Sequence, residues 1–464
     1  MENSRKSSCD LAERVADALS PVLPAGSTIL LGLSGGVDSV VLLHLLHQLA
    51  PRYSWHLNAL HVHHGISPHA DEWATFCTDL CARHEIPFQI EQVDIAPLRE
   101  HGIEAAARKL RHAAFDRQPV DFIALAHHQD DQAETLLLQL LRGAGLRGAS
   151  AMPVIRQRTD HRTQLRPLLD VARSELLAYA QQHALQWVED ESNADDAYPR
   201  NFLRHRVLPL LEQRFPAYRE TLARGARHFA EASELLDQLA QQDANIFPSP
   251  SGGGARGEGE PFAGGALEVA RLQALSLSRA KNLLRYFLHS LGAPMPQAVQ
   301  LDDMLQQLCG ARQGAAVLLT FGNWQLRRYQ DNVYAFPALP EPDAELCTQW
   351  LGEAVLELPE LGGTLHFEPV IGHGLSLEKL HQATVTVRLR HGAERIRLDD
   401  KRPTRTLKNL LQEQCIPPWQ RDRLPLLFCG ETLVAIPGIG VECAYQAAQE
   451  EAGVVLRWSA TSIE

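Results

Sequence analysis

Short apolar runs alternate with amphipathic stretches over residues 27–187 of the chain. Three apolar runs are each followed by a stretch with helical spacing: 28–33 then 40–49, 57–62 then 71–84, and 122–126 then 132–141. Strands that interleave with helices in this way predict an α/β fold built on a parallel, doubly wound sheet. Such sheets bind ligands at the carboxyl ends of their strands, so we expect functional side chains directly after each run.

The pattern changes beyond residue 217. Helical periodicity covers 218–239, 267–291 and 297–308, and β-type alternation follows in 384–389, 396–398 and 433–436. Seven glycines fall within 249–265, which indicates a flexible linker or loop insertion. We therefore predict three domains: a catalytic domain over 1–217, a helical domain over 218–342 that contains the glycine-rich insert, and a small α+β domain over 345–464.

Bulk composition narrows the class of protein. The chain has 464 residues, 45% of them apolar and 22% charged, which fits two to four globular domains. Acidic residues outnumber basic ones by 56 to 44, and the net charge of −12 argues against nonspecific coating of nucleic acid or membranes. No two of the eight cysteines form a CxxC pair, as is typical of reduced cytosolic proteins. Because we find neither a signal peptide nor a membrane-spanning apolar run, we predict a cytoplasmic protein with no membrane partner.

The first junction between a strand and a helix reads Ser34, Gly35, Gly36, Val37, Asp38, Ser39. Its glycines allow a tight turn that exposes successive amide protons, and the following helix adds partial positive charge at the same point. Ser34 and Ser39 can donate hydrogen bonds to phosphate oxygens, whereas Asp38 would repel phosphate unless a divalent cation lies between them. The junction therefore predicts a phosphate loop that uses Mg2+ and is of neither the Walker nor the dinucleotide type. The alternative is an ordinary glycine turn.

The second junction is rich in histidine and ends at a glycine. It runs from His61 through two further histidines to Gly65. A zinc site is disfavoured because no cysteine or carboxylate follows at ligand spacing. The alternatives are a polar strand end and part of a ligand site.

The third junction begins at His127 and leads into an acidic helical turn. Asp130 or Asp131 is predicted to cap the helix. Asp131 and Glu134, three residues apart, project from one face and could share a magnesium ion near Asp38. The alternative is a capping box with solvated acids.

The loop at 34–39 resembles the SGGVDS sequence of the PP-loop family of ATP pyrophosphatases. The resemblance implies that Ser34 to Ser39 hold the β and γ phosphates of ATP, which leaves the α phosphorus open to attack and releases pyrophosphate. It also implies that the second junction, with His61 and Gly65, holds the adenine base. Arg108 reads as a solvated helix residue when taken alone, and the resemblance places it in the nucleotide site.

Further motifs resemble those of tRNA(Ile)-lysidine synthetases, densely over the first 217 residues and again near the carboxyl terminus. They lie at 61–65, 104–108, 127–134, 142–145, 166–169, 189–193 and 198–204, then at 387–392, 407–412 and 416–426. The resemblance implies ATP-dependent ligation of free lysine to the wobble cytidine of tRNA(Ile) with a CAU anticodon. ATP would adenylate the carbon-2 oxygen, and the lysine ε-amine would then displace AMP.

The same resemblance implies roles for individual side chains. Catalytic roles fall to Asp38, His127, Asp131, Glu134 and Arg204, and Mg2+ binding falls to Asp38, Asp131 and Glu134. Because lysine must lose a proton before it attacks, one of these carboxylates or His127 should act as the base.

A local basic patch is the expected tRNA footprint of this acidic chain. Residues 388–408 hold eight basic and three acidic side chains, a net charge of plus 5. The basic side chains are Arg388, Arg390, Arg395, Arg397, Lys401, Arg402, Arg405 and Lys408. Arg388 and Arg390 are predicted to share one strand face, as are Arg395 and Arg397, with Trp419 and Arg421 nearby. We expect tRNA rather than DNA as the partner, and the alternative is a solvated basic face.

Two rival functions are left open. A tRNA thiolation enzyme of the same PP-loop family would also adenylate a base, but the clustered cysteines it would use are absent from the three junctions. A noncatalytic tRNA-binding protein with an inactive nucleotide fold would have no use for Asp38, Asp131 and Glu134. Release of pyrophosphate and transfer of lysine distinguish these three functions.

Overall fold

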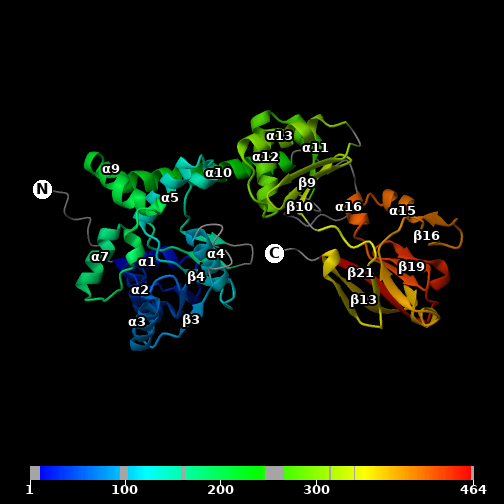
Figure 1. Ribbon diagram of the computed structural model, residues 1–464, viewed down its shortest axis with the longest axis horizontal. Coiled ribbons are helices and arrows are strands. Elements are labelled where there is room, and N and C mark those ends of the chain that lie inside the picture. Colours follow the sequence, from blue (N-terminus) through cyan, green and yellow to red (C-terminus); the bar gives the residue numbers. More distant parts are fainter. Residues whose placement is uncertain are drawn as a thin grey trace. The chain divides into compact units, whose positions relative to one another are not determined.

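The computed structural model describes residues 11–94, 103–157, 162–245, 266–312, 315–338 and 340–460. The chain divides into two compact units, residues 1–236 and 237–464, and each has its own hydrophobic core (Figure 1). The predicted insert at 249–265 lies outside the described residues. No helix among the described residues is both long enough and apolar enough to span a membrane.

A six-stranded sheet forms the centre of the first unit. Its order is β3-β2-β1-β4-β6-β5, and neighbouring strands are parallel except for β5 and β6. The strands are β1 (Thr28–Gly32), β2 (His56–His63), β3 (Phe88–Gln92), β4 (Phe122–Ala124), β5 (Ile155–Gln157) and β6 (Thr163–Leu165). The predicted parallel sheet is confirmed, and β3, β6 and the antiparallel edge strand β5 are additions that the apolar runs did not predict.

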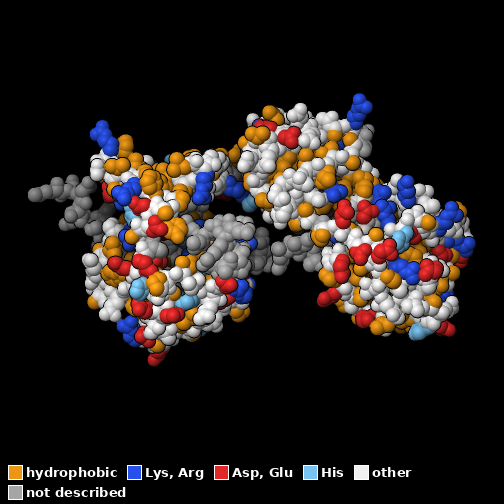
Figure 2. Space-filling view, in the orientation of Figure 1, with side chains coloured by type: hydrophobic (Ala, Val, Ile, Leu, Met, Phe, Trp, Pro, Cys, Tyr) orange, Lys and Arg blue, Asp and Glu red, His pale blue; other side chains and the backbone are white. Residues whose placement is uncertain are grey.

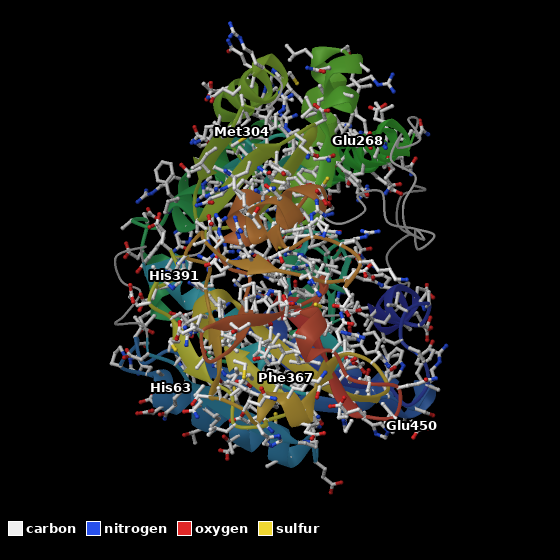
Figure 3. The ribbon with its side chains drawn as sticks, turned by 90° about the vertical axis from the view of Figure 1, so that its right-hand side faces the viewer. His63, Glu268, Met304, Phe367, His391 and Glu450 are labelled. Carbon is white, nitrogen blue, oxygen red and sulfur yellow. The ribbon has the colours of Figure 1, made fainter. Side chains whose placement is uncertain are left out.

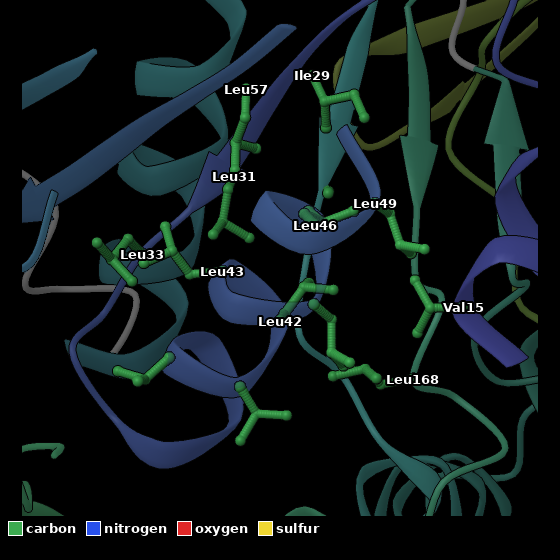
Figure 4. Packing of buried hydrophobic residues seen from close by; sticks show 14 of the residues in the cluster. Val15, Ile29, Leu31, Leu33, Leu42, Leu43, Leu46, Leu49, Leu57 and Leu168 are labelled. Atoms are coloured by element: carbon green, nitrogen blue, oxygen red, sulfur yellow. The ribbon is translucent and has the colours of Figure 1, made fainter. Parts of the chain in front are cut away.

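Helices cover both faces of this sheet, as the doubly wound prediction requires. The helices of this unit before residue 218 are α1 (Leu11–Leu19), α2 (Val37–Tyr53), α3 (Ala70–Arg83), α4 (Ile103–Asp116), α5 (Gln129–Leu141), α6 (Leu146–Ala149), α7 (Arg173–Gln182), α8 (Pro199–Phe202) and α9 (Leu208–Arg214). Because side chains alternate along a strand, Ile29 and Leu31 (Figure 4) pack with α1, α2 and α7. Leu30 points to the other face and packs against Phe115 of α4. The long helix α10 (Tyr218–Asn245) continues from the first unit into the second.

The first part of the second unit combines helices with a sheet. The helices α11 (Val269–Ala274), α12 (Leu277–Ser290) and α13 (Ala298–Gly310) agree with the predicted helical periodicity. An antiparallel sheet of order β7-β10-β9-β8 packs against them and was not predicted. Its strands are β7 (Ala266–Glu268), β8 (Val317–Phe321), β9 (Trp324–Tyr329) and β10 (Asn332–Pro337). Met304 of α13 lies in the shared core (Figure 3).

The carboxyl-terminal part is built from antiparallel sheets with a few short helices, in agreement with the predicted α+β class. One sheet has the order β11-β15-β18-β19-β20, a second has the order β12-β13-β21-β14, and β16 pairs with β17. The strands are β11 (Cys347–Gln349), β12 (Val355–Leu358), β13 (Gly363–Ile371), β14 (Leu375–Ser376), β15 (Val385–Arg388), β16 (Arg395–Ile396), β17 (Arg405–Thr406), β18 (Leu426–Cys429), β19 (Thr432–Ile436), β20 (Gly440–Val441) and β21 (Ala452–Ala460). The helices are α14 (Leu377–Leu380), α15 (Leu407–Glu413) and α16 (Pro418–Arg421). Phe367 of β13 stacks on Trp350 with ring centroids 4.4 Å apart, within one core that both larger sheets share (Figure 3).

Candidate active site at the carboxyl edge of the parallel sheet

The glycine loop lies between β1 and α2, where the sequence places it. Gly35 has a φ of +88°, and a Cβ atom there would lie 2.8 Å from Val188 Cγ2, so both conformation and space require glycine. Ser34 Oγ lies 3.1 Å from Ser39 Oγ, and Ser39 Oγ donates a hydrogen bond to the Gly36 carbonyl. No side chain caps the amino terminus of α2, which leaves its first amides available to an anion. This geometry supports the expected phosphate cradle.

Asp38 extends from the first turn of α2 toward the third junction. Its Oδ2 lies 3.5 Å from Nε2 of His128, a side chain that is only 2% exposed. Asp131 Oδ2 lies 3.5 Å from the same nitrogen. The fold therefore brings Asp38 and Asp131 to the same ring nitrogen of one histidine, although they are far apart in the chain.

The cap of α5 differs from the prediction. His128, rather than Asp130 or Asp131, is the N-cap residue: the Asp131 amide donates to His128 Nδ1, and the Asp131 carboxylate accepts from the His128 amide at 3.0 Å. The acids are not solvated, because Asp131 is ion-paired with Arg200 and Asp130 accepts hydrogen bonds from Arg219 Nε and from the Arg173 amide. Histidine is not a favoured cap in sequence statistics, which is why the cap was missed.

The electrostatics of this cluster follow from burial and charge. Burial alone would raise the pKa of Asp131, but the neighbouring His128 and Arg200 outweigh it and lower that pKa to about 2. Burial likewise opposes protonation of His128, yet Asp131 and Asp38 raise the pKa of His128 above its usual value. The two carboxylates thus favour a proton on His128 Nε2, the ring nitrogen that faces them, while Nδ1 accepts from the Asp131 amide.

Glu134 has both of its oxygens bound to arginines. Arg204 Nε donates to Oε1 at 2.7 Å, and Arg200 Nε donates to Oε2 at 2.6 Å. The carboxylate is fully buried, and Asp131 Oδ1 also lies 3.1 Å from Arg200 Nη2. The arginines come from α8 and from the π-helical segment Leu203–Val207, a rare conformation that is frequent at functional sites.

His127 and Arg108 belong to the same edge of the sheet. His127 Nδ1 is buried without a hydrogen-bond partner among the described residues. Burial, together with the positive charges of Arg166, Arg200 and Arg108, outweighs the attraction of Asp131 and lowers the pKa of His127 to about 3. His127 is therefore neutral near pH 7, and the charge of Arg108 is close enough to influence it.

In the second junction, His61 lies within β2 and Gly65 follows the end of that strand. His61 is 5% exposed, and its Nδ1 lies 2.9 Å from the Leu33 carbonyl, which requires a proton on that nitrogen. Gly65 has a φ of +64°, and a Cβ atom added there would meet no other atom within 4 Å, so open space adjoins the backbone. The predicted adenine role of His61 and Gly65 stays a prediction.

The carboxylates fit the predicted Mg2+ unequally. Asp38 Oδ1 is buried and has no partner among the described residues. This oxygen is therefore available as a ligand for a divalent cation. Asp131 is close enough to contribute, whereas Glu134 is occupied by two arginines. The described residues contain no group of three histidine, cysteine or acidic side chains that could by itself hold a metal. Asp38 and Asp131 therefore fit the ion, and its other ligands would have to come from substrate and water.

Two functional candidates escaped the sequence analysis: Arg200 and His128. Arg200 lies in the stretch 198–204, where a proline at the first helical position signalled a helix start but nothing in the local spacing pointed to Glu134. His128 sits beside the predicted His127, and only the backbone decides which of the two faces Asp38.

The predicted basic patch is largely neutralised by ion pairs. Arg388 pairs with Glu431, Arg390 with Asp422, Arg397 with Asp400, Arg402 with Asp399, and Arg405 with Glu413. Figure 2 shows acidic and basic side chains interleaved over this part of the surface. Arg395, Lys401 and Lys408 have no ion pair in the described part of the chain. All three side chains are exposed.

Two details of the patch prediction are wrong. β15 ends at Arg388 and β16 ends at Ile396, so neither predicted arginine pair shares a strand face. Trp419 packs among the rings of Tyr329, Tyr334 and Phe336, and the buried Arg421 donates a hydrogen bond to the Tyr329 hydroxyl at 2.9 Å. These two side chains fasten α16 to β9 and β10 and do not form a free surface.

Three domain families match separate parts of the chain. Residues 8–211 match the PP-loop domain, residues 267–334 match the TilS substrate binding domain, and residues 385–458 match the TilS substrate C-terminal domain. The matches follow the order of the three predicted domains, whose boundaries stay predictions.

Several curated proteins are similar to this chain over almost its whole length. The tRNA(Ile)-lysidine synthase of Nitrosomonas europaea is 42% identical over 94% of this chain and 93% of its own length. That of Coxiella burnetii is 37% identical over 93% of both chains. Among solved structures, the U34-tRNA thiolase NcsA of Methanococcus maripaludis covers 48% of this chain and 78% of its own at 19% identity, with a TM-score of 0.40. A crystal structure of a TilS C-terminal domain covers 25% of this chain and 96% of its own at 21% identity, with a TM-score of 0.22. Likenesses at these TM-scores add nothing to a functional assignment.

Proposed function

The chain belongs to the tRNA(Ile)-lysidine synthase family, and from that premise we propose how its carboxyl-edge site performs the reaction. The protein is an ATP-using ligase that forms lysidine on tRNA(Ile). The observation that carries the residue-level proposal is the meeting of Asp38, His128 and Asp131 beside the phosphate loop. A cytoplasmic location stays a prediction.

We propose that free L-lysine and the wobble cytidine of a CAU anticodon are the two groups joined. ATP first transfers its adenylyl group to the carbon-2 oxygen of the cytosine and releases pyrophosphate. The lysine ε-amine then attacks carbon 2 and displaces AMP. Catalysis of such a transfer rests mainly on positioning and on stabilisation of charge.

The glycine loop supplies the positioning of the nucleotide. Amides at the start of α2, together with the Ser34 and Ser39 hydroxyls, would bind the β and γ phosphates. Asp38 and Asp131 would hold Mg2+ against those phosphates, and the bound ion would neutralise their charge. Glu134 is proposed to act differently, because its contacts orient the guanidinium groups of Arg200 and Arg204 toward the reacting phosphate.

The low pKa values of His127 and Asp131 bear on removal of the lysine proton. A general base works best when its pKa lies near the working pH. The pKa of His127 is lowered to about 3 by burial and neighbouring arginines, and the pKa of Asp131 is lowered to about 2 by His128 and Arg200 against the effect of burial. Neither group is well matched to that task before the substrates bind.

The function is tested by incorporation of radiolabelled lysine into a tRNA(Ile) transcript with ATP. The matched control transcript carries uridine in place of the wobble cytidine. Lysine should enter the first transcript alone, with one AMP and one pyrophosphate released for each lysine. Pyrophosphate release without lysine transfer would point to the thiolation alternative, and no release at all would indicate an inactive nucleotide fold.

Thiol chemistry has little support in the geometry. Cys77 lies close to the phosphate loop, 3.2 Å from a Cβ atom placed on Gly35, but burial raises the pKa of its thiol to about 12. A protonated thiol is a poor nucleophile. The neighbouring Cys81 is also buried, and its pKa is raised to about 11 by the same cause.

Replacing each of the eight cysteines singly with alanine should leave lysine transfer within about threefold of the parent rate in reducing buffer. The decisive variant is Cys77→Ala, and the exposed Cys415→Ala is its matched control. Circular dichroism separates a folding defect from a chemical one. A folded Cys77→Ala protein that has lost all turnover would restore the thiolation hypothesis.

We also propose that the unpaired cations of the patch hold tRNA phosphates. The change is a triple alanine variant of Arg395, Lys401 and Lys408, and the control is the triple variant of the ion-paired Arg388, Arg390 and Arg397. The first variant should weaken tRNA binding and flatten the slope of log affinity against log salt by up to about 0.9 per lost contact. The control should change the slope less, because its guanidinium groups are already neutralised. Identical slopes for all three proteins would mean that the patch is a solvated face.

A further inference from the structure

Arg166 is a buried cation directly after β6, at the carboxyl edge of the sheet. It is 4% exposed. Its Nη1 donates to the Pro153 carbonyl at 2.8 Å, and its Nη2 donates to Gln164 Oε1 at 2.6 Å. Both acceptors are neutral. The Nε atom is buried and has no hydrogen-bond partner among the described residues.

Arg166 differs from the other buried arginines that the structure describes, because its Nε atom has no hydrogen-bond partner. In Arg271, Nε donates to the Glu268 carboxylate, and in Arg328 and Arg421 it donates to backbone carbonyls. A guanidinium carries five N–H donors, so Arg166 retains three of them beyond its two bonds. An unmet buried donor is costly unless a ligand satisfies it.

The charge of Arg166 is uncompensated as well. No carboxylate forms an ion pair with it in the described part of the chain, and the charges that act on it most strongly are those of Arg156 and Arg108. Burial, reinforced by those two arginines, lowers the pKa of Arg166 to about 10, which still leaves it a cation near pH 7. A cation that is buried among cations is stabilised by an incoming anion.

The strand order indicates which anion this is. Arg166 follows β6, His127 follows β4, and the phosphate loop follows β1, in the spatial order β1-β4-β6. With strands about 4.8 Å apart, Arg166 lies roughly 10 Å from the loop that grips the triphosphate. It lies only one strand from His127, whose pKa its charge lowers. This position, two strands from the loop, favours an anion other than the triphosphate.

We propose that Arg166 binds the α-carboxylate of the lysine substrate and so sets where its ε-amine is delivered. This inference rests on the proposed function. An extended lysine spans roughly 7 Å from its ε-nitrogen to its carboxylate, since each staggered bond of about 1.5 Å advances the chain by a little over 1 Å. That length bridges the distance from Arg166 to the edge of β4. A planar guanidinium pairs with a carboxylate in two parallel hydrogen bonds, which fixes orientation as well as affinity.

The test compares lysine with two amines that lack the carboxylate, lysinamide and 1,5-diaminopentane. The parent protein should use lysine at least about 30-fold more efficiently than either, given the usual strength of a charge-assisted pair. In Arg166→Gln, the KM for lysine should rise by at least about tenfold while turnover of diaminopentane stays near the parent value, so that the preference collapses. Arg156→Gln removes an exposed neighbouring charge and should leave the preference unchanged.

Several results would overturn the inference. If the parent protein uses diaminopentane as efficiently as lysine, the inference is refuted without any variant. Equal losses with lysine and diaminopentane in Arg166→Gln would assign Arg166 a purely structural role, and a raised KM for ATP in the adenylation step would assign the anion to the nucleotide. If Arg166→Gln does not fold, the preference is measured in Arg166→Lys, which keeps the charge but loses the paired donors. An unchanged preference there refutes the proposal, and a reduced one supports it.

Adenylation of tRNA without lysine separates this proposal from the proposed function. Pyrophosphate release in that half-reaction should be the same for the parent and Arg166→Gln. A parent protein that neither releases pyrophosphate nor transfers lysine would refute the proposed function itself. A parent that does both, with a preference for lysine that Arg166→Gln leaves unchanged, would refute only the carboxylate site.

Discussion

Replacing Asp38 with asparagine should lower ATP-dependent lysine transfer by at least about two orders of magnitude, the usual size of one electrostatic catalytic contribution. The substitution keeps the shape of the side chain and removes its charge. Asp38 Oδ2 faces His128, whereas Oδ1 has no protein partner in the described residues and is free to bind a cation. We expect this loss because the proposed Mg2+ ion would lose one of its two carboxylate ligands.

The measurement is pyrophosphate release and lysine transfer across a Mg2+ titration, with thermal unfolding as the folding readout. The asparagine variant should need a higher Mg2+ concentration for half-maximal rate. Asp71→Asn is the matched control: Asp71 lies in the first turn of α3, its side chain is 93% exposed, and its carboxylate contacts His63. The control should behave as the parent does. Parent-like rates in Asp38→Asn would remove the proposed role of the loop carboxylate.

Replacing Glu134 with glutamine should destabilise the protein by about 3 kcal/mol or more and abolish most of its activity. The fully buried carboxylate neutralises Arg200 and Arg204, and without it two guanidinium groups face each other with Asp131 as their remaining acidic partner. Breaking one member of a buried charge network is costly because the other members stay buried and uncompensated. Without Glu134, Arg200 and Arg204 would also no longer be held in the position that we propose for them at the reacting phosphate.

A second substitution separates stability from chemistry in this network. Arg200→Met in the Glu134→Gln background removes one of the two guanidinium charges that lost Glu134, and it should restore part of the stability but none of the activity. Glu212→Gln is the matched control, because Glu212 also pairs with an arginine, Arg219, but is 48% exposed. Its loss should cost no more than about 1 kcal/mol. Chemical denaturation and single-turnover lysine transfer measure the two effects, and a stable, active Glu134→Gln variant would contradict the proposed network.

The sequence by itself predicted a parallel sheet and the functional side chains at its carboxyl edge. The runs at 28–33, 57–62 and 122–126 became β1, β2 and β4, because periodic apolar residues report which faces of a chain are buried. The glycine turn at 34–39 was equally predictable, since a turn between a strand and a helix needs no distant partner to form. Parallel strands end at a common edge, so the junctions had to come together.

Only the tertiary structure decided which side chains meet across that edge. Glu134 binds arginines that lie 66 and 70 residues further along the chain, and Arg388 pairs with Glu431, 43 residues away. Local spacing predicts contacts within one helix or strand and carries no information on such pairs, whose distances depend on how separate elements pack. The same limit explains the contact of the His128 cap with Asp38, the neutralised basic patch and the sheet of β7 to β10. Each depends on a partner that the chain reaches only after it has folded.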